Sequence, residues 1–169
     1  MNKITSVLKH NLYKRLKNDY NTHKSLIIAF DFDNTIRPFG SEFEKMDCSP
    51  VINLLQRCSN LGFTLILFTV TVHGTIESKE KYIFSRDQGL TKGKFYTNEC
   101  ALFNESPKPY YNCLLDDRAG LFETYSALNR LVSEIEFKNK TINQIIKEPG
   151  NKETKISKLH KIIEKIRKS

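Results

Sequence analysis

Two aspartates spaced two residues apart, Asp31 and Asp33, carry the chemistry that this sequence suggests first. They follow the apolar run 27–30, which is typical of a buried parallel strand. Open α/β sheets place their ligands at the carboxyl ends of such strands. Two adjacent carboxylates repel each other unless a cation or a proton compensates their charge. The segment 27–35 is therefore a candidate metal and nucleophile site, although Asp-x-Asp also occurs in plain turns.

Two further polar clusters follow apolar runs of the same kind. Thr69 comes after residues 63–68, and Asp116 and Asp117 come after residues 113–115. The carboxyl ends of parallel strands share one edge of a sheet, so we expect all three clusters to converge there. This convergence is a stronger indication of a site than any one cluster.

The elements that must position these residues alternate between strand and helix. Strand patterns cover 26–30, 63–68, 95–96 and 113–115. Helix patterns cover 2–20, 49–60, 75–88, 119–138 and a last amphipathic segment from 156. Between the last two lie a short apolar segment, 142–146, and a break at Pro149-Gly150. The alternation predicts an α/β fold, a Rossmann-like three-layer sandwich with a central parallel sheet.

Residues 26–130 resemble the haloacid dehalogenase-like (HAD) superfamily. The motifs that carry the resemblance are Asp31-Phe32-Asp33-Asn34-Thr35, Leu65-Ile66-Leu67-Phe68-Thr69, Lys108 and Leu114-Leu115-Asp116-Asp117-Arg118. Only 35 residues separate Asp33 from Thr69, and 38 separate Thr69 from Lys108. The chain therefore looks capless, with at most a small flap at 37–46. We expect a single HAD-like domain over 1–169, with a motif core at 25–138 and basic terminal helices at 1–24 and 139–169.

The resemblance implies a phosphatase that depends on Mg²⁺. Asp31 would be the nucleophile that forms an aspartyl-phosphate. Asp33 would protonate the leaving alcohol and then deprotonate the attacking water. Thr69 would donate its hydroxyl to a phosphoryl oxygen, and Lys108 would neutralise negative charge, a role for which Lys92 and Lys94 compete.

The resemblance also implies which residues bind metal and substrate. Mg²⁺ prefers oxygen ligands, and the expected metal-site residues are Asp31, Asp33 through its backbone carbonyl, Asp116 and Asp117. Asp117 would orient Lys108 or a metal-bound water. The expected substrate-binding residues are Asn34, Thr69, Val70 and Lys108. Thr35 is expected to fix the turn after Asp33 rather than touch substrate.

Charge is distributed unevenly over this chain, whose formal net charge is +8. Residues 1–24 carry six Lys/Arg and one Asp, and residues 138–169 carry ten Lys/Arg and three Glu. The middle of the chain is mildly acidic, with eleven basic and fifteen acidic residues. The basic ends indicate either contact with nucleic acid or ordinary solvated helix faces.

The substrate class stays open between a phosphorylated small molecule, such as a nucleotide, and a nucleic-acid phosphate end. The layout is similar to the phosphatase part of phage-type polynucleotide kinase-phosphatases. Those proteins commonly follow their second motif with Gly-Arg, whereas residues 69–74 here contain no Arg. The alternative functions are a nucleic-acid or partner-binding protein on a HAD scaffold with little or no turnover, and phosphotransfer to an acceptor other than water.

The remaining features concern the compartment and the cysteines. No apolar run reaches the roughly 18 residues that a membrane span needs, and residues 1–20 lack the apolar core of a signal peptide. The four cysteines form no CxxC pair and no zinc-finger pattern with the histidines. We expect a soluble cytoplasmic protein with reduced thiols and no membrane partner.

Overall fold

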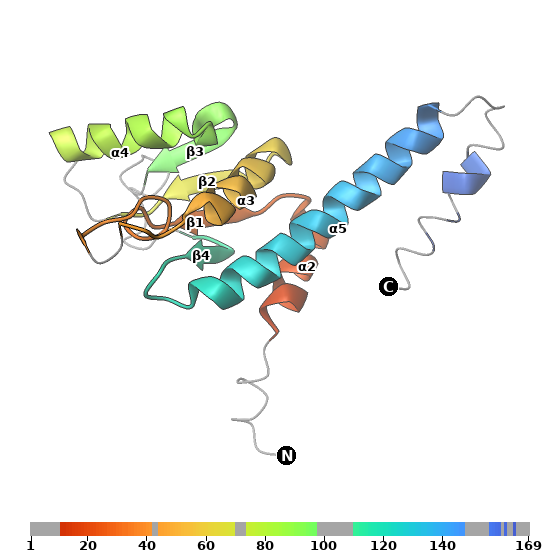
Figure 1. Ribbon diagram of the computed structural model, residues 1–169. Coiled ribbons are helices and arrows are strands. Elements are labelled where there is room, and N and C mark those ends of the chain that lie inside the picture. Colours follow the sequence, from red (N-terminus) through yellow and green to blue (C-terminus); the bar gives the residue numbers. More distant parts are fainter. Residues whose placement is uncertain are drawn as a thin grey trace, which may run out of the picture. The chain divides into compact units, whose positions relative to one another are not determined.

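The computed structural model describes residues 11–41, 44–69, 74–97, 110–147, 156–159, 161 and 164. The strands are β1 (Ile27–Phe30), β2 (Thr64–Leu67), β3 (Lys94–Thr97) and β4 (Cys113–Leu115). The helices are α2 (Leu12–His23), α3 (Ser49–Asn60), α4 (Ile76–Asp87), the short 3₁₀ helix η2 (Leu90–Lys92) and α5 (Leu121–Lys147). Strands and helices alternate as the sequence predicts, so the α/β class is confirmed (Figure 1).

The four strands form one sheet in the order β3-β2-β1-β4, and every neighbouring pair is parallel. Phe30 at the end of β1 is paired with Leu67 of β2 and with Leu115 of β4. The pairing continues for one step, since the Asp31 N–H donates to the Leu115 carbonyl over 2.8 Å. The carboxyl ends of β1, β2 and β4 therefore lie side by side. This arrangement is compatible with a Rossmann-like sandwich.

The core is built from the apolar strands and from one face of each packed helix. Helix α3 buries Val51, Leu54, Leu55 and Cys58, which share one helical face. Pro50 at its start fits the first turn, where a missing N–H costs nothing. Helix α4 contacts both the strand edge and the loop after β1, through the ring pairs Tyr82–Phe95 and Phe32–Phe84.

Helix α5 ends later than the sequence predicts. The helix predicted over 119–138 runs on to Lys147 and absorbs the apolar segment 142–146. No Gly or Pro interrupts residues 121–148, and a helix continues until its backbone or its packing stops it. The Thr141 hydroxyl also donates to the Phe137 carbonyl within the same helix. The predicted break at Pro149-Gly150 lies outside the described residues.

The other boundaries agree closely with the prediction. Each strand, β3 included, begins and ends within one residue of its predicted limits, and α3 matches 49–60. The described part of the first predicted helix ends at His23 instead of Tyr20, and Lys24 closes it in the left-handed conformation at φ 58°.

The chain divides into two compact units, Met1–Leu131 and Val132–Ser169. The first unit contains the whole sheet and all the polar clusters described below. The described residues of the second unit are the rest of α5 and the helical residues near 156–164. Among the described residues, no helix combines the length and apolarity that crossing a bilayer requires.

Candidate active site

The loop after β1 folds back on itself directly behind Asp31. The Phe32 carbonyl accepts hydrogen bonds from the Ile36 and Arg37 N–H groups, at 3.1 and 3.2 Å. Asn34 stands in the left-handed region at φ 55°, which Asn tolerates better than most residues. Its N–H donates to the Arg37 carbonyl over 2.7 Å. This turn places Asp31 and Asp33 at the carboxyl edge of the sheet.

Thr35 connects this loop to the loop after β4. The Thr35 side chain is buried, and its hydroxyl oxygen accepts the Asp117 N–H over 3.2 Å. Within the second loop, an Asp116 carboxylate oxygen accepts the Arg118 N–H over 2.8 Å. The printed hydrogen bond of the Thr35 side chain therefore joins the loop after β1 to the loop after β4.

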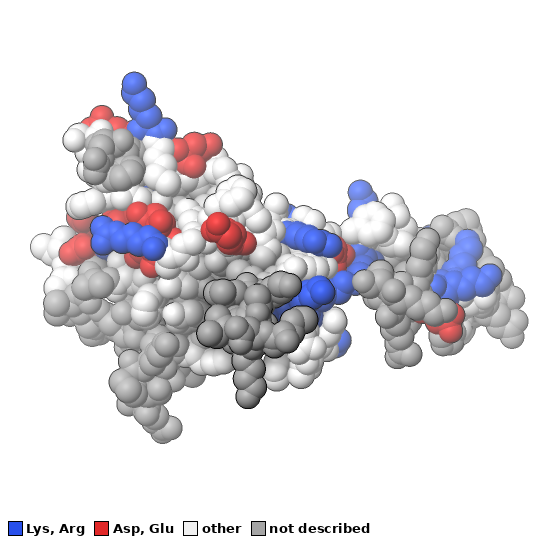
Figure 2. Space-filling view, turned by 90° about the horizontal axis from the view of Figure 1, so that it is seen from below, with Lys and Arg blue, Asp and Glu red and all other residues white. Residues whose placement is uncertain are grey.

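The aspartates of the two loops come close enough to interact electrostatically. Burial raises the pKa of Asp31 above its ordinary value, and the charges of Asp116, Asp33 and Asp117 raise it further. A hydrogen bond from the Phe32 backbone acts in the opposite direction. Figure 2 shows acidic side chains, with Lys and Arg side chains beside them, on the part of the first unit toward which the strands point. The structure therefore brings together the four aspartates that the sequence singles out.

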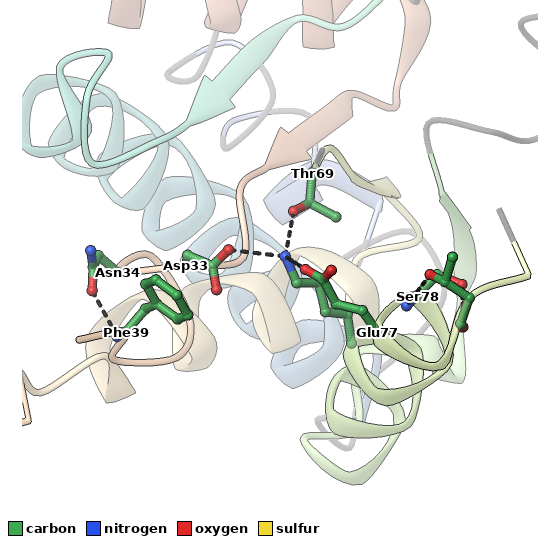
Figure 3. Close-up of polar contacts among 8 residues, drawn as sticks. Asp33, Asn34, Phe39, Thr69, Glu77 and Ser78 are labelled. Atoms are coloured by element: carbon green, nitrogen blue, oxygen red, sulfur yellow. Dashed lines mark hydrogen bonds and ion pairs between the residues drawn. The ribbon is translucent and has the colours of Figure 1, made fainter. Parts of the chain in front are cut away.

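Lys81 is a member of the site that sequence reasoning missed. It comes from α4 and is only 6 % exposed. Its ammonium nitrogen lies 2.9 Å from an Asp33 carboxylate oxygen, 3.0 Å from the Thr69 hydroxyl and 3.1 Å from a Glu77 carboxylate oxygen (Figure 3). It also lies 5.1 Å from the centre of the Phe32 ring. One cation thereby links the ends of β1 and β2 to α4.

The charge state of Lys81 follows from these contacts. Burial lowers its pKa, but the hydrogen bonds and charges of Asp33 and Glu77 outweigh burial and leave the pKa raised. Lys81 is therefore an ammonium ion at neutral pH. The sequence carries no clear signal for Lys81, because a lysine on a helix is solvated in most proteins.

A pocket of about 320 Å³ lies beside Asp33. The loop segment 37–40 forms one wall and α4 forms the other; the lining residues are Phe32, Asp33, Arg37, Pro38, Phe39, Gly40, Glu77, Glu80 and Lys81. The Asn34 side-chain oxygen accepts the Phe39 N–H over 2.8 Å (Figure 3). Asn34, expected to bind substrate, is buried and uses this oxygen to hold the pocket wall.

The lysine expected in the third motif falls outside the described part of the chain. Lys108 and Val70 are both there, so their roles stay predictions. Lys92 and Lys94 do not lie at the site. Lys94 begins β3 and is paired with Thr64 at the start of β2, which places it at the amino edge of a parallel sheet. These two alternatives to Lys108 are therefore wrong.

The described cysteines do not belong to the site. Cys48, Cys58 and Cys113 are buried free thiols, as the sequence analysis expects. Burial raises the pKa of Cys113 to about 12, so this thiol is not a nucleophile at neutral pH.

The oxygen donors at this edge fit a hard divalent cation. In the described residues, no three His, Cys, Asp or Glu side chains converge as the ligands of one ion. The expected set needs only two side chains, because Mg²⁺ keeps several waters and can take a backbone carbonyl. The mutual repulsion that raises the Asp31 pKa is relieved by a cation bound among these carboxylates. The donor chemistry and the charge therefore both suit Mg²⁺.

Comparisons with known proteins give no match. No model of a known protein family matches this chain, and neither a curated protein nor a solved structure is significantly similar to it.

Proposed function

We propose that this protein is a Mg²⁺-dependent phosphatase of the HAD type that hydrolyses phosphate monoesters. The observation that supports it most is the gathering of Asp31, Asp33, Asp116 and Asp117 at the carboxyl edge of the sheet. A structural role gives little reason to place three further carboxylates within electrostatic reach of Asp31, because each raises the cost of ionising it. A site for a cation and a phosphoryl group gives such a reason.

The proposed reaction has two steps. In the first, an Asp31 carboxylate oxygen attacks phosphorus, the bond from phosphorus to the ester oxygen breaks, and Asp33 protonates the departing oxygen. In the second, a water oxygen attacks phosphorus, Asp33 accepts a proton from that water, and the Asp31–phosphorus bond breaks. The products are an alcohol and inorganic phosphate, and both carboxyl groups return to their initial states.

Bound Mg²⁺ would supply positive charge against the phosphoryl oxygens. Asp31, the Asp33 backbone carbonyl and Asp116 would hold it. Lys108 is proposed to add a second positive charge. Thr69 is proposed to donate to a phosphoryl oxygen from its place at the end of β2.

Lys81 is the partner of Asp33 in this scheme, because its ammonium nitrogen lies 2.9 Å from an Asp33 carboxylate oxygen. A phosphoryl group entering between them is itself an anion and would compete for Lys81.

The test is phosphate release by the purified full chain. The substrates are nucleoside monophosphates, sugar phosphates and oligonucleotides phosphorylated at either end, each with Mg²⁺ and with a chelator. We expect turnover only with Mg²⁺, and a loss of at least ~10³-fold in Asp31→Asn. Asp87→Asn is the matched control, because Asp87 is an exposed residue at the end of α4 and should retain full activity.

Equal turnover by the wild type and Asp31→Asn would exclude the mechanism. Salt-dependent binding of DNA or RNA, combined with no turnover of any ester, would favour the alternative of a binding protein. The basic ends of the chain are the segments that would contact nucleic acid in that alternative.

A further inference from the structure

None of the four sequence motifs accounts for most of the pocket beside Asp33. Asp33 is its one lining residue that belongs to the reacting carboxylates; Phe32 precedes it, and the rest comes from the loop wall and α4. Its volume, about 320 Å³, is at the lower end of the roughly 300–1,000 Å³ that small-molecule sites occupy. The pocket can take the organic part of a small ester, whereas a polynucleotide would fill it with one residue and extend beyond.

An exposed aromatic ring stands at the loop wall of the pocket. Phe39 is 65 % exposed, yet its backbone is held by the hydrogen bond to Asn34, and Pro38 before it restricts the chain further. Phe39 lies beside Asp33 in Figure 3. A solvated phenyl ring whose backbone is held next to a reacting group offers a face on which a planar ring can stack.

The opposite wall is acidic. Glu77 and Glu80 are three residues apart on α4 and share one helical face. Ionised carboxylates accept hydrogen bonds from hydroxyl groups and repel phosphates. The cations in the lining have partners within the protein: Lys81 is bound to Asp33 and Glu77, and Arg37 lies over the Phe84 ring. The wall therefore suits a sugar and disfavours further phosphate groups.

We propose that this pocket binds the nucleoside part of a nucleoside monophosphate, which makes small nucleotides, not phosphorylated ends of nucleic acid, the substrate class. The inference rests on the proposed phosphatase function. The phosphoryl group points to Asp31, the sugar hydroxyls face Glu77 and Glu80, and the base stacks on Phe39. A polynucleotide would bring an additional backbone phosphate with each nucleotide toward the two glutamates.

The first experiment compares kcat/KM of the full chain for AMP and UMP, for ribose 5-phosphate, and for short oligonucleotides phosphorylated at either end. We expect Phe39→Ala to lower kcat/KM for the nucleotides about 10-fold, within the range of base–aromatic stacking, and to change that for ribose 5-phosphate less than about 2-fold. Phe39→Tyr should restore the loss. Phe122→Ala is the matched control, since Phe122 is 78 % exposed on α5 and should change nothing.

A second variant tests the acidic wall. Glu80→Lys should raise kcat/KM for the oligonucleotides relative to AMP by about 3-fold or more, because one repulsive charge becomes attractive. A preference of the wild type for oligonucleotide ends over AMP would overturn the inference. So would an equal effect of Phe39→Ala on nucleotides and on ribose 5-phosphate.

Equilibrium binding separates this inference from the phosphatase proposal. AMP binding to Asp31→Asn is measured by calorimetry with Mg²⁺, with and without Phe39→Ala. If no ester is hydrolysed but AMP binds and Phe39→Ala weakens binding, the phosphatase proposal fails while the pocket assignment holds. If esters are hydrolysed and AMP binding does not depend on Phe39, the pocket assignment fails alone.

Discussion

The ends of β1 and β4 both carry two aspartates, but their surroundings differ. At the end of β1, Asp33 has a buried ammonium group 2.9 Å away, supplied by α4. At the end of β4, no described Lys or Arg forms an ion pair with Asp116 or Asp117, and their recorded hydrogen bonds involve backbone N–H groups. Among the described residues, one loop therefore has an ion-paired cation beside it, and the other has none.

The difference separates two carboxylates that look alike in the sequence. Asp33 is held by a cation that competes with any metal for its side chain, so a role for its carboxyl group in proton transfer is the better fit. Burial raises the pKa of Asp31, and the charges of both loops raise it further. Near Asp116, where no described Lys or Arg forms an ion pair, a divalent cation would gain the most favourable electrostatic energy on binding.

The largest expected effect tests this division directly. Asp116→Asn should weaken Mg²⁺ binding by at least about 10-fold, whereas Asp33→Asn should change it by less than about 3-fold, because only the backbone of Asp33 is proposed as a ligand. Calorimetric titration with Mg²⁺ measures both. Equal losses in the two variants would contradict the assignment of separate roles.

Removing Lys81 should destabilise the fold and disturb the first loop. Lys81→Met leaves Asp33 and Glu77 without their common partner, and we expect a loss of about 2 kcal/mol in the free energy of unfolding, since Asp33 is partly solvated. Urea unfolding gives the value. Lys79→Met, an exposed lysine on the same helix, is the control and should stay within about 0.5 kcal/mol of the wild type.

The link between the two loops is weaker and should cost less. Thr35→Val keeps the shape of the side chain but removes the acceptor of the Asp117 N–H. We expect a loss of about 1 kcal/mol in stability, which is typical of one hydrogen bond. A double-mutant cycle with Asp116→Asn, read by Mg²⁺ affinity, would show whether this bond positions the β4 loop.

The smallest effect is a dependence of stability on pH. Asp31 has a folded pKa above its ordinary value of 3.8, so the folded state favours its protonated form. Its contribution to stability is present below that value and is lost as pH rises through the folded pKa. In Mg²⁺-free solution Asp31→Asn should therefore gain stability relative to the wild type as pH rises. Thermal unfolding of both proteins across this range measures the difference. If the stability of Asp31→Asn minus that of the wild type falls as pH rises, the assignment is contradicted.

Sequence patterns predict the strands well because each strand is a short apolar run between polar residues. The clusters Asp31/Asp33, Thr69 and Asp116/Asp117 can be placed at one edge for the same reason: parallel strands share their carboxyl ends. The end of α5 could not be placed in this way. Residues 138–141 are polar enough to resemble a loop, and only the unbroken hydrogen bonding of the helix carries it on to Lys147.

The burial of Lys81 is the second feature that the sequence does not predict. A lysine on a helix is solvated in most proteins, so its place in the sequence gives no reason to bury it. The packing of α4 beside the loop after β1 decides its role, because the same ammonium then reaches Asp33, Thr69 and Glu77. Phe39 is similar, since its position depends on the left-handed turn at Asn34.

The paired carboxylates Asp31 and Asp33 were determined by local order along the chain: an apolar strand followed by Asp-x-Asp needs no distant residue to be recognised. Which carboxylate has a lysine beside it was decided only by the tertiary structure. The physical reason is that charge compensation acts through space, between residues 48 positions apart in the chain. Residue types set what chemistry is available, and packing sets the charge that each group experiences.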